Sequence, residues 1–434
     1  MKIAIVGTGV SGLVAAHMLH PHHEITVFES DTRIGGHANT VDIEVDGQSV
    51  AVDTGFIVYN ERNYPGFRAL LDRLGVATQP TEMSFSVSDP RTGLEFRGSN
   101  LNAIFAQRRN LANTSFLRLL ADITRFNRAA RRLVAGEARW SGPDRLPDGD
   151  GFDLHAEETL ADFVHRGRFS RSFVRQFLIP FGASIWSADP TTFMRFPVRA
   201  YARFMDNHGL LELARPPEWR TVTGGSRRYV EALTAPFSHR IQLGLPVQKI
   251  VTHEGVGGSQ LIEVLTGRGP ELFDRVIAAT HSDQVLRMLA DGSTAEREIL
   301  GAIGYQRNTA TLHTDERMLP RNPRARASWN YAIAENARGT TVTYWMNRLQ
   351  SIETRRPLLV TLNRPDEIDP RMRIAEFEYH HPVFDVPAMV AQRRRAEIQG
   401  RRGIYFAGAY WGYGFHEDGV QSALEVVRLI ESRR

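Results

Sequence analysis

A glycine-rich turn near the N-terminus has the residue types and spacing that bind a diphosphate. Residues 7–12 read G-x-G-x-x-G, and they stand between a short apolar run and a helix pattern at 10–19. Gly7 permits a tight turn, Gly9 lets the backbone approach a pyrophosphate, and Gly12 allows close packing of helix on strand. Because the helix N-terminus adds N–H groups and partial positive charge, this segment predicts a dinucleotide-binding fold.

An acidic residue follows where such folds bind a ribose. Glu29 comes directly after the second predicted strand, residues 24–28, and about 20 residues after Gly7, which is the spacing of this motif. A carboxylate there is placed to accept hydrogen bonds from a ribose diol. FAD and NAD share this half of the motif, so these residues alone leave both cofactors open.

The residues that follow Glu29 favour FAD. Residues 29–36 read E-x-x-x-R-x-G-G, which resembles a segment of the flavin amine oxidase superfamily. That superfamily includes monoamine and polyamine oxidases, phytoene desaturases, protoporphyrinogen oxidase and a polyunsaturated fatty acid isomerase. The resemblance implies that Arg33 and the backbone of Gly35 and Gly36 meet the pyrophosphate. A guanidinium suits this task because it offers two parallel N–H groups to phosphate oxygens.

Later segments resemble the same superfamily, in the same order. Residues 53–57 resemble the stretch that passes the isoalloxazine ring, and Val247 matches a strand whose backbone pairs with the adenine. Residues 406–409 and 419–423 look like the closing motif, in which a helix N-terminus faces the pyrimidine end of the flavin. The resemblance thus implies FAD held by Gly7, Gly9, Val10, Ser11, Gly12, Glu29, Ser30, Arg33, Gly35, Gly36, His37, Gly55, Phe56, Val247, Gly408, Gly419 and Val420.

The sequence departs from the superfamily pattern at three places. His37 stands where many members have Arg or Lys, and Ala409 stands where an Asp often follows the last glycine. Amine oxidases of this superfamily typically carry a lysine on a substrate-domain strand, bridged through water to flavin N5. The comparable stretch, residues 305–313, has none, since the only lysines are Lys2 and Lys249. This difference argues against amine oxidation with rapid use of oxygen.

The segments at 35–40, 344–350 and 408–419 look most like a bacterial branch of FAD-binding oxidoreductases associated with cyclopropane-type fatty acid modification. That resemblance implies a small, largely apolar substrate such as an acyl chain. The aromatic loop at 408–419 would then border the flavin. Rings can line an apolar slot there, and His416 or Glu417 can move a proton.

The predicted catalytic residues all belong to this aromatic loop. An equal alternative is that the rings of this loop pack against the substrate domain. His281 and Tyr59 are weaker candidates for residues at the flavin face. The predicted catalytic set is Trp411, Tyr413 and His416.

The elements that must position these residues alternate along the chain. Strand patterns at 2–6 and 24–28 flank the first helix. They return at 247–251, 261–265, 275–279 and 403–408, and a closing helix is expected at 419–432. Long helical patterns occupy 114–133 and 159–185. Alternating patterns at 309–313, 341–345 and 358–362 predict an antiparallel sheet, and a basic helix is expected near 392–399.

These patterns predict an α/β fold of two discontinuous domains. A Rossmann-like FAD-binding domain of the amine-oxidase type comprises residues 1–78, 215–290 and 400–434. A mixed α+β substrate-binding domain, with a helical part and an antiparallel sheet, comprises residues 79–214 and 291–399.

Composition narrows the chemistry further. The 434 residues include no cysteine, which excludes disulfides, thiolate nucleophiles and a thioether link to flavin, so we expect noncovalent FAD. The histidines lack metal-ligand spacing, so no metal site is predicted. The net charge is only +4 and no basic block is interleaved with stacking aromatics, so no nucleic acid partner is predicted. With neither a signal segment nor a long apolar run, we expect a cytoplasmic protein.

Residues 114–132 form a basic amphipathic pattern with arginines on one side. Such a helix either packs as an ordinary surface helix or makes peripheral contact with an anionic membrane, which would suit an acyl substrate.

The function predicted from the sequence is therefore an FAD-dependent oxidoreductase that acts on a small apolar, fatty-acyl-like substrate. Its reaction would be desaturation, oxidation or flavin-assisted isomerisation, with flavin N5 accepting a hydride. One alternative is an amine oxidase that produces hydrogen peroxide. Another is a non-catalytic flavin-binding partner of a lipid-modifying enzyme.

Overall fold

A five-stranded parallel sheet carries the N-terminal motif in the computed structural model, which describes all residues except 99, 137–157, 212–216, 255–259, 335–338 and 433–434. The predicted boundary at residues 214–215 lies outside the described part. The sheet draws its strands from three distant stretches of chain. Their spatial order is β10 (Ile241–Gln242), β2 (Glu24–Phe28), β1 (Lys2–Val6), β14 (Arg275–Ala278) and β20 (Ile404–Phe406).

Alternate side chains of β1 enter two different layers. Ile3 and Ile5 face α1 (Val10–Leu19), α2 (Pro65–Leu74), α10 (Arg227–Thr234) and α15 (His416–Glu431). Ala4 and Val6 face the opposite layer, with α11 (Ser282–Met288), α12 (Thr294–Gly301) and α14 (Val386–Arg393). That second layer also contains the antiparallel strands β11 (Val247–Glu254), β12 (Gln260–Thr266) and β13 (Gly269–Phe273). Burial on both faces explains why every residue of β1 after Lys2 is apolar.

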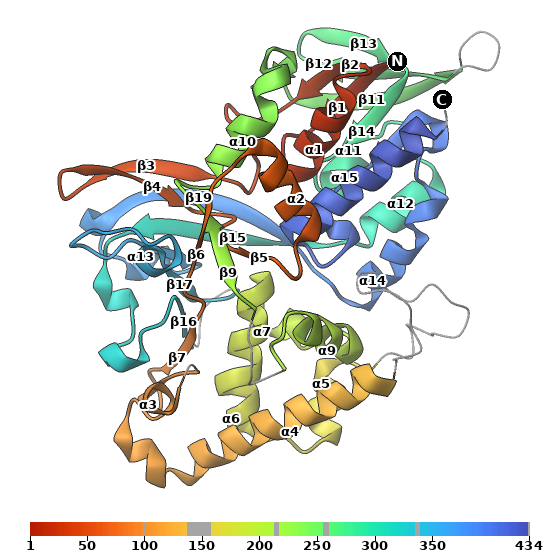
Figure 1. Cartoon of the computed structure of the whole chain (residues 1–434). Coiled ribbons are helices and arrows are strands. Elements are labelled where there is room, and N and C mark those ends of the chain that lie inside the picture. The colour runs from red at the N-terminus through yellow and green to blue at the C-terminus, as the bar shows by residue number, and fades with distance from the viewer. Residues whose placement is uncertain (99, 137–157, 212–216, 255–259, 335–338, 433–434) are drawn as a thin grey trace.

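A seven-stranded sheet forms the centre of the molecule (Figure 1). Its order is β19 (Arg373–Pro382), β15 (Tyr305–His313), β18 (Leu359–Leu362), β17 (Val342–Trp345), β16 (Trp329–Ala332), β7 (Phe85–Asp89) and β8 (Leu94–Arg97). The predicted strands, now β15, β17 and β18, pair antiparallel as expected, but β16 and β7 pair in parallel, so the whole sheet is mixed. The parallel pair arises because β7 comes from a stretch about 240 residues before β16, so no hairpin fixes the direction of β7.

Two small sheets join these layers. Strands β3 (Thr40–Val45) and β4 (Gln48–Asp53) form a hairpin whose turn residues Asp46 and Gly47 both have positive φ, at 53° and 79°. An Asp-Gly turn of this kind matches the twist of the strands it connects. The other small sheet consists of β5 (Tyr59–Asn60), β9 (Trp219–Val222) and β6 (Thr78–Pro80).

Helices occupy the lower end of the molecule in Figure 1. They are α3 (Leu101–Ile104), α4 (Thr114–Gly136), α5 (Leu160–Arg166), α6 (Arg171–Phe173), a π-helical stretch at Val174–Leu178, α7 (Ile179–Trp186), α8 (Pro190–Phe193) and α9 (Val198–Asn207). A short helix α13 (Met346–Leu349) follows β17. The single helical pattern predicted at 159–185 is broken, because Arg168 adopts φ 49° and the Ser170 side chain caps a new helix.

Helices near the C-terminus differ from prediction in their limits. The basic helix expected at 392–399 is instead the last two residues of α14, which covers 386–393, followed by a 3₁₀ turn at Arg394–Glu397. α15 begins at residue 416 instead of 419, because the Asp418 carboxylate reaches back and accepts the N–H of Phe415 at 2.8 Å, which caps the start of the helix. The aromatic loop is therefore shorter than predicted, and His416 and Glu417 lie on a helix.

Candidate functional site

The start of α1 offers backbone N–H groups beside open space. No side chain caps this helix at Gly9, and its first turn contains no acidic residue. A Cβ on Gly12 would lie 2.0 Å from the Gly7 carbonyl oxygen, whereas one on Gly9 would meet no described atom within 4 Å. Gly12 therefore permits close packing, while Gly9 borders space that no described residue fills. Free N–H groups beside such space fit a phosphate.

The double glycine of residues 29–36 lies directly against this turn. Gly35 N–H donates to the Thr8 carbonyl at 3.1 Å, and a Cβ on Gly36 would lie 3.1 Å from Gly9 Cα. The two glycines have φ of 111° and 58°, which residues with a side chain rarely adopt. The two predicted phosphate-binding segments thus form one continuous backbone wall.

Arg33 stands beside this wall with an incomplete set of partners. Its Nε lies 3.4 Å from the Asp31 carboxylate, but its buried Nη1 has no hydrogen-bond acceptor among the described residues. An unpaired buried donor of this kind costs about 1–3 kcal/mol. A phosphate oxygen would supply the missing acceptor, so the residues present fit the diphosphate of a dinucleotide.

The Glu29 carboxylate, which we predicted to meet a ribose, is held by backbone N–H groups. It accepts the N–H of Thr8 at 2.9 Å and that of Asp31 at 2.8 Å, and Ser30 Oγ lies 3.2 Å away. Its backbone carbonyl accepts the N–H of Leu245 at 2.8 Å, which brings the start of β11 and buried Val247 alongside. Glu29, Ser30 and Val247 therefore lie in one neighbourhood, so the residues assigned to the adenosine end are close together.

The C-terminal piece closes onto the same turn. A Cβ on Gly419 would lie 2.6 Å from Val10 Cγ1 and 2.9 Å from Ser11 Oγ, so only glycine lets α15 cross α1 here. Gly408 N–H donates to Ser422 Oγ at 3.1 Å, which ties the end of β20 to α15. Val420 is buried in the core between these helices and contributes packing. Three stretches of chain hence meet at the start of α1.

The segment after β4 joins this meeting point through His37. Phe56 N–H donates to the His37 carbonyl at 2.8 Å, and a Cβ on Gly55 would lie 2.0 Å from that oxygen. The Phe56 ring stacks on the His416 ring, with centroids 3.6 Å apart. Gly55, Phe56, His37 and the first residue of α15 are thus neighbours, as the predicted flavin-ring site requires.

His416 and Glu417 have structural partners. His416 Nε2 lies 3.0 Å from the Tyr229 hydroxyl, so the ring is turned toward the core. The Glu417 carboxylate accepts the N–H groups of Gly66 at 2.9 Å and Phe67 at 2.8 Å, where α2 begins without another cap. The predicted role of Glu417 in moving a proton is not supported, because both oxygens serve as a helix cap.

Trp411 and Tyr413 also differ from the predicted placement. Trp411 is buried, and its Nε1 donates to the Phe406 carbonyl at 3.0 Å, so it belongs to the core. Tyr413 packs in the helical layer, with its ring 5.7 Å from that of Phe204. Packing is therefore the role that their surroundings support.

Three histidines from distant stretches gather beside the Gly55–Phe56 segment. The His37 ring centroid lies 5.3 Å from that of His381 and 5.8 Å from that of His281. His381 Nδ1 lies 3.1 Å from the Asn308 amide nitrogen on β15, and His281 stacks on Tyr305 at 4.5 Å. We call His37, His281 and His381 the imidazole group. Sequence reasoning did not single out His381, since only the fold brings it to His37.

The imidazole group is held neutral near pH 7. Burial lowers the pKa of both His281 and His381 to about 4. Burial, together with the neighbouring imidazoles, lowers the pKa of His37 well below its usual value of 6.5. Burial also lowers the pKa of His416 to about 3. Neutral imidazoles can each donate one hydrogen bond and accept another, which suits the handling of a proton.

Asp53 fixes the segment that leads to Gly55. Its buried carboxylate accepts the Ser226 N–H at 2.9 Å, Ser226 Oγ at 2.8 Å and the Gln350 amide at 3.0 Å. Burial raises the pKa of Asp53 to about 6. The residue therefore clamps three separate stretches together, a role that sequence reasoning missed because its partners lie far along the chain.

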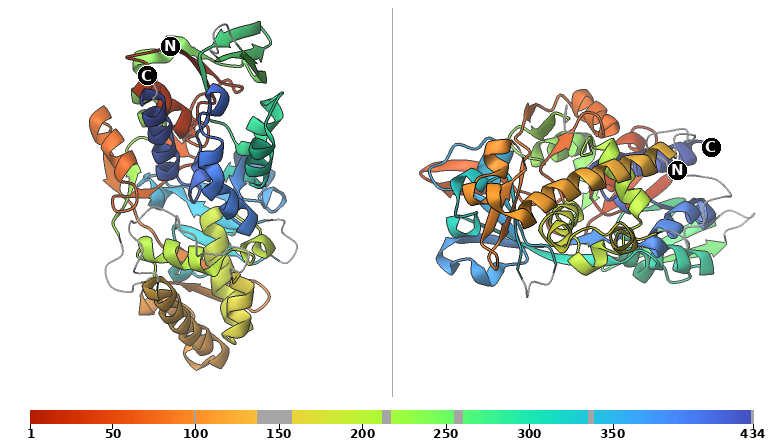
Figure 2. Two further views of the ribbon diagram at one scale, coloured as in Figure 1. Left: turned by 90° about the vertical axis from the view of Figure 1, so that its right-hand side faces the viewer. Right: turned by 90° about the horizontal axis from the view of Figure 1, so that it is seen from below.

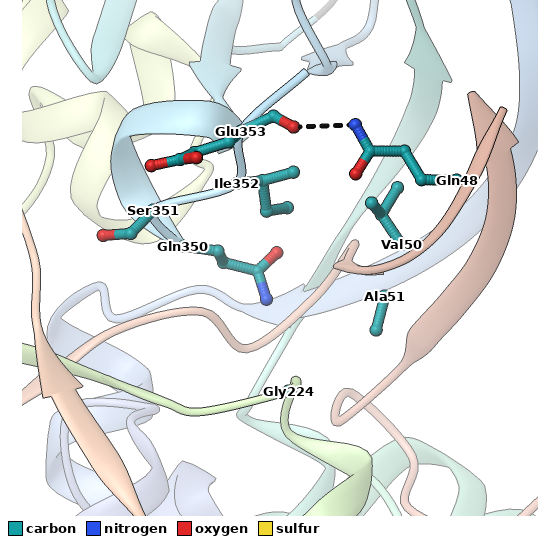
Figure 3. Close-up of a pocket in the computed structure, with 8 residues that line it drawn as sticks. All are labelled: Gln48, Val50, Ala51, Gly224, Gln350, Ser351, Ile352 and Glu353. Carbon is teal, nitrogen blue, oxygen red and sulfur yellow. Dashed lines mark hydrogen bonds between the residues drawn. The ribbon is translucent and has the colours of Figure 1, made fainter. Parts of the chain in front are cut away.

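A surface hollow of about 290 Å³ lies on the outer side of this clamp (Figure 3). Gln48 Nε2 donates across it to the Glu353 carbonyl at 3.0 Å. Its lining comprises Gln48, Val50, Ala51, Gly224, Gln350, Ser351, Ile352 and Glu353. None of these is a predicted site residue.

Two further properties bear on the sequence predictions. Within the described stretches, no set of three or more histidine, cysteine, aspartate or glutamate side chains is grouped so as to hold a metal ion. None of the helices traced in the described chain combines the length and the apolar character that crossing a bilayer demands.

Comparison with known proteins gives one family and one fold. The model of the family described as flavin containing amine oxidoreductase matches residues 10–371. A CLA-producing fatty acid isomerase from P. acnes is 16% identical, with 98% of each chain covered and a TM-score of 0.68. Wild-type putrescine oxidase bound to putrescine is 15% identical, with both chains fully covered and a TM-score of 0.69.

A third solved structure, cyclohexylamine oxidase from Brevibacterium oxydans, is 15% identical, with 99% of each chain covered and a TM-score of 0.69. No curated protein matches the sequence. At these identities the structural likeness establishes the fold, which these proteins of different substrates share.

Proposed function

Because the chain belongs to the flavin-containing amine oxidoreductase family, it is a flavin-dependent oxidoreductase, and we propose that it binds FAD noncovalently and acts on an apolar, acyl-like substrate. The observation that carries the FAD proposal is the buried, unpartnered Nη1 of Arg33 beside the open space at Gly9. No described residue accepts a hydrogen bond from that nitrogen.

In this proposal each part of the cofactor is bound by a different group of residues. The N–H groups at the start of α1, the Gly35–Gly36 backbone and Arg33 hold the diphosphate, and Glu29 holds the ribose. The start of α15 faces the pyrimidine end of the flavin ring. The absence of cysteine from the sequence excludes a thioether link and supports noncovalent binding.

Half-buried aromatic side chains support an apolar substrate. Phe177 and Phe181 stack at 5.7 Å, and Phe85 meets Phe181 edge-on at 5.1 Å. These rings remain partly exposed where the helical layer meets the mixed sheet, although fully buried phenylalanines surround them. Phe177 also lies in the π-helical stretch, a distortion that occurs often at functional sites. An acyl chain is the substrate class that such a lining favours.

The imidazole group supplies the proton chemistry in this proposal. Bound flavin provides a hydride acceptor for a substrate carbon. His381 Nδ1 is occupied by Asn308, so Nε2 is the atom that we assign to exchange a proton with the substrate. His37 and His281 stand within ring contact to pass that proton onward. Desaturation of an acyl chain requires such a group, because loss of a hydride from one carbon must be followed by loss of a proton from its neighbour.

The FAD proposal is tested by titrating the flavin-free protein with FAD. An Arg33→Gln variant should bind FAD about 10- to 100-fold more weakly, because one charge-assisted hydrogen bond contributes about 1.5–3 kcal/mol. Arg68→Gln is the matched control, since Arg68 is a half-exposed surface arginine paired with Glu61 at 3.1 Å. Folded protein that is colourless and refuses FAD would contradict the proposal outright.

An amine substrate is the second candidate, favoured by the family and by neighbours such as putrescine oxidase. The two lysines argue against it. Lys2 pairs with Glu271 at 3.7 Å and Lys249 lies on β11, so neither belongs to β15. Anaerobic mixing with fatty acids and with amines separates the candidates: bleaching of the visible flavin band by an amine, with rapid peroxide formation in air, would favour amine oxidation.

A further inference from the structure

Three exposed leucines stand close together in the sequence at the helical end of the molecule. Leu101, Leu111 and Leu117 are 75%, 57% and 41% exposed, and the first two are the most exposed large apolar side chains of the described chain. Solitary exposed leucines are ordinary, but three within one short stretch are not. We call these three residues the leucine edge.

A well-packed base holds the leucine edge in place. The rings of Phe96 and Phe105 lie 5.3 Å and 5.9 Å from that of Phe116, which is buried beneath. Side-chain caps fix both helix starts, since Asn100 accepts the Ala103 N–H at 2.9 Å and Asn113 accepts the Ser115 N–H at 3.1 Å. The leucines are therefore outward-facing members of an ordered surface.

The same stretch is cationic without compensation. Arg108, Arg109 and Arg118 are exposed, and the sequence contains no acidic residue between 96 and 121. Arg109 donates to the Gly93 carbonyl at 2.7 Å and Arg108 to the Phe105 carbonyl at 3.2 Å, which are neutral acceptors. None of the three arginines forms an ion pair within the described chain, so their charge faces outward.

The position of the stretch leaves it free to meet a flat surface. α3, the 3₁₀ turn at Arg108–Ala112 and the start of α4 lie at one extremity of the molecule, opposite the N- and C-termini (Figure 1). Seen from below in Figure 2, α4 crosses the outer face and these elements lie at its end. The apolar side of α4, including Phe126 and Ala130, is buried against the protein.

We propose that the leucine edge and its arginines dock the enzyme on an anionic lipid bilayer. Leucines enter the boundary between head groups and acyl chains while arginines meet lipid phosphates, which is how interfacial segments bind. A bilayer fits better than a second protein chain, because the charge is of one sign and borders the apolar side chains. The inference does not depend on the flavin chemistry, although a membrane would also supply acyl substrates.

The test is cosedimentation of the whole protein with vesicles of phosphatidylcholine alone or mixed equally with phosphatidylglycerol. We expect binding only to the anionic vesicles, weakened by salt. Replacing Arg108, Arg109 and Arg118 by Gln should weaken binding about fivefold per arginine. The variant Leu101→Gln, Leu111→Gln and Leu117→Gln should lose roughly tenfold or more.

The matched control replaces Leu272, Met372 and Ile374 by Gln, since these side chains are 50%, 39% and 42% exposed on other elements. It should bind vesicles as the wild type does, and all variants should keep the same melting temperature. Equal loss in the control, or wild-type protein indifferent to anionic lipid, overturns the proposal. So does a wild-type dimer that the leucine variant converts to monomer, because the edge would then be an interface between copies.

Discussion

Replacing Gly9 by alanine separates the folding role of the glycine turn from its binding role. Gly9 has φ −64° and ψ 172°, which alanine adopts readily, and a Cβ there would meet no described atom within 4 Å. The flavin-free variant should therefore gain about 0.4–1 kcal/mol in unfolding free energy, through reduced freedom of the unfolded chain. The added methyl would nevertheless occupy space that the diphosphate needs.

The expected loss of affinity follows from the bonds that the methyl disrupts. A hydrogen bond from a backbone N–H to a charged phosphate contributes about 1.5–3 kcal/mol, so two such bonds amount to about 3–6 kcal/mol. FAD binding should therefore weaken by roughly two to four powers of ten. Fluorescence titration of flavin-free protein measures the affinity, and thermal unfolding of the same samples measures the stability.

Gly98→Ala is the control, because its Cβ also meets no described atom within 4 Å but lies in the turn after β8. Both variants should unfold at or slightly above the wild-type temperature, and only Gly9→Ala should lose FAD. Unchanged FAD affinity in Gly9→Ala refutes the placement of the diphosphate over this turn. Failure of Gly9→Ala to fold refutes the claim that the space there is open.

Two further outcomes follow from buried titratable groups. Glu417→Ala should lower the unfolding free energy by about 1–3 kcal/mol in urea titrations, because two N–H groups at the start of α2 lose their acceptor; a shifted pH profile of flavin reduction at unchanged stability would instead make Glu417 a proton donor. Acidification below pH 6.5 should destabilise the fold. In the unfolded chain His281 and His381 take up protons near pH 6.5, whereas in the folded protein burial lowers their pKa to about 4 and they stay neutral. At about pH 5 each of these histidines lowers the free energy of unfolding by up to about 2 kcal/mol. Protonation of Asp53, whose pKa burial raises to about 6, increases it by only about 1 kcal/mol. Urea titrations near pH 7.5 and pH 5 measure this loss of unfolding free energy. The double variant with His281→Gln and His381→Gln should lose less between the two pH values than the wild type, and an equal loss would contradict the assignment.

The sequence alone was sufficient for the βαβ unit at the N-terminus. The predicted limits of 2–6, 10–19 and 24–28 are those of β1, α1 and β2. Here every local signal agrees, because an apolar run, a glycine turn and a proline after the helix each specify the same element boundaries. The flavin-dependent family predicted from the later segments is likewise confirmed by the family match over residues 10–371.

Features of the fold that depend on tertiary contacts could not be predicted from the local sequence. The pattern at 159–185 reads as one helix, yet the chain turns at Arg168 so that Phe163 and Phe169 can stack on each other. The hairpin of β3 and β4 was missed although its Asp-Gly turn at 46–47 is a recognisable signal. The imidazole group has no local signature at all, because its members come from three separate stretches.

The start of α15 shows how a small error in a boundary changes a chemical assignment. Read as loop residues, His416 and Glu417 seem available for proton transfer. With the helix beginning at 416, Glu417 projects to the start of α2 and His416 stacks on Phe56. The groups that we propose to handle a proton beside the Gly55–Phe56 segment are then the imidazoles.

The basicity of those imidazoles bears on the substrate. An alkylammonium has a pKa of about 10.4, and an amine must lose that proton before hydride can leave the adjacent carbon. Transferring it to His281 or His381, whose pKa burial lowers to about 4, would cost about 9 kcal/mol at 1.36 kcal/mol per pKa unit. An acyl chain brings no such proton into the site. If the imidazole group takes the substrate proton, as we propose, the weak basicity that burial imposes would disfavour a charged amine relative to an acyl substrate.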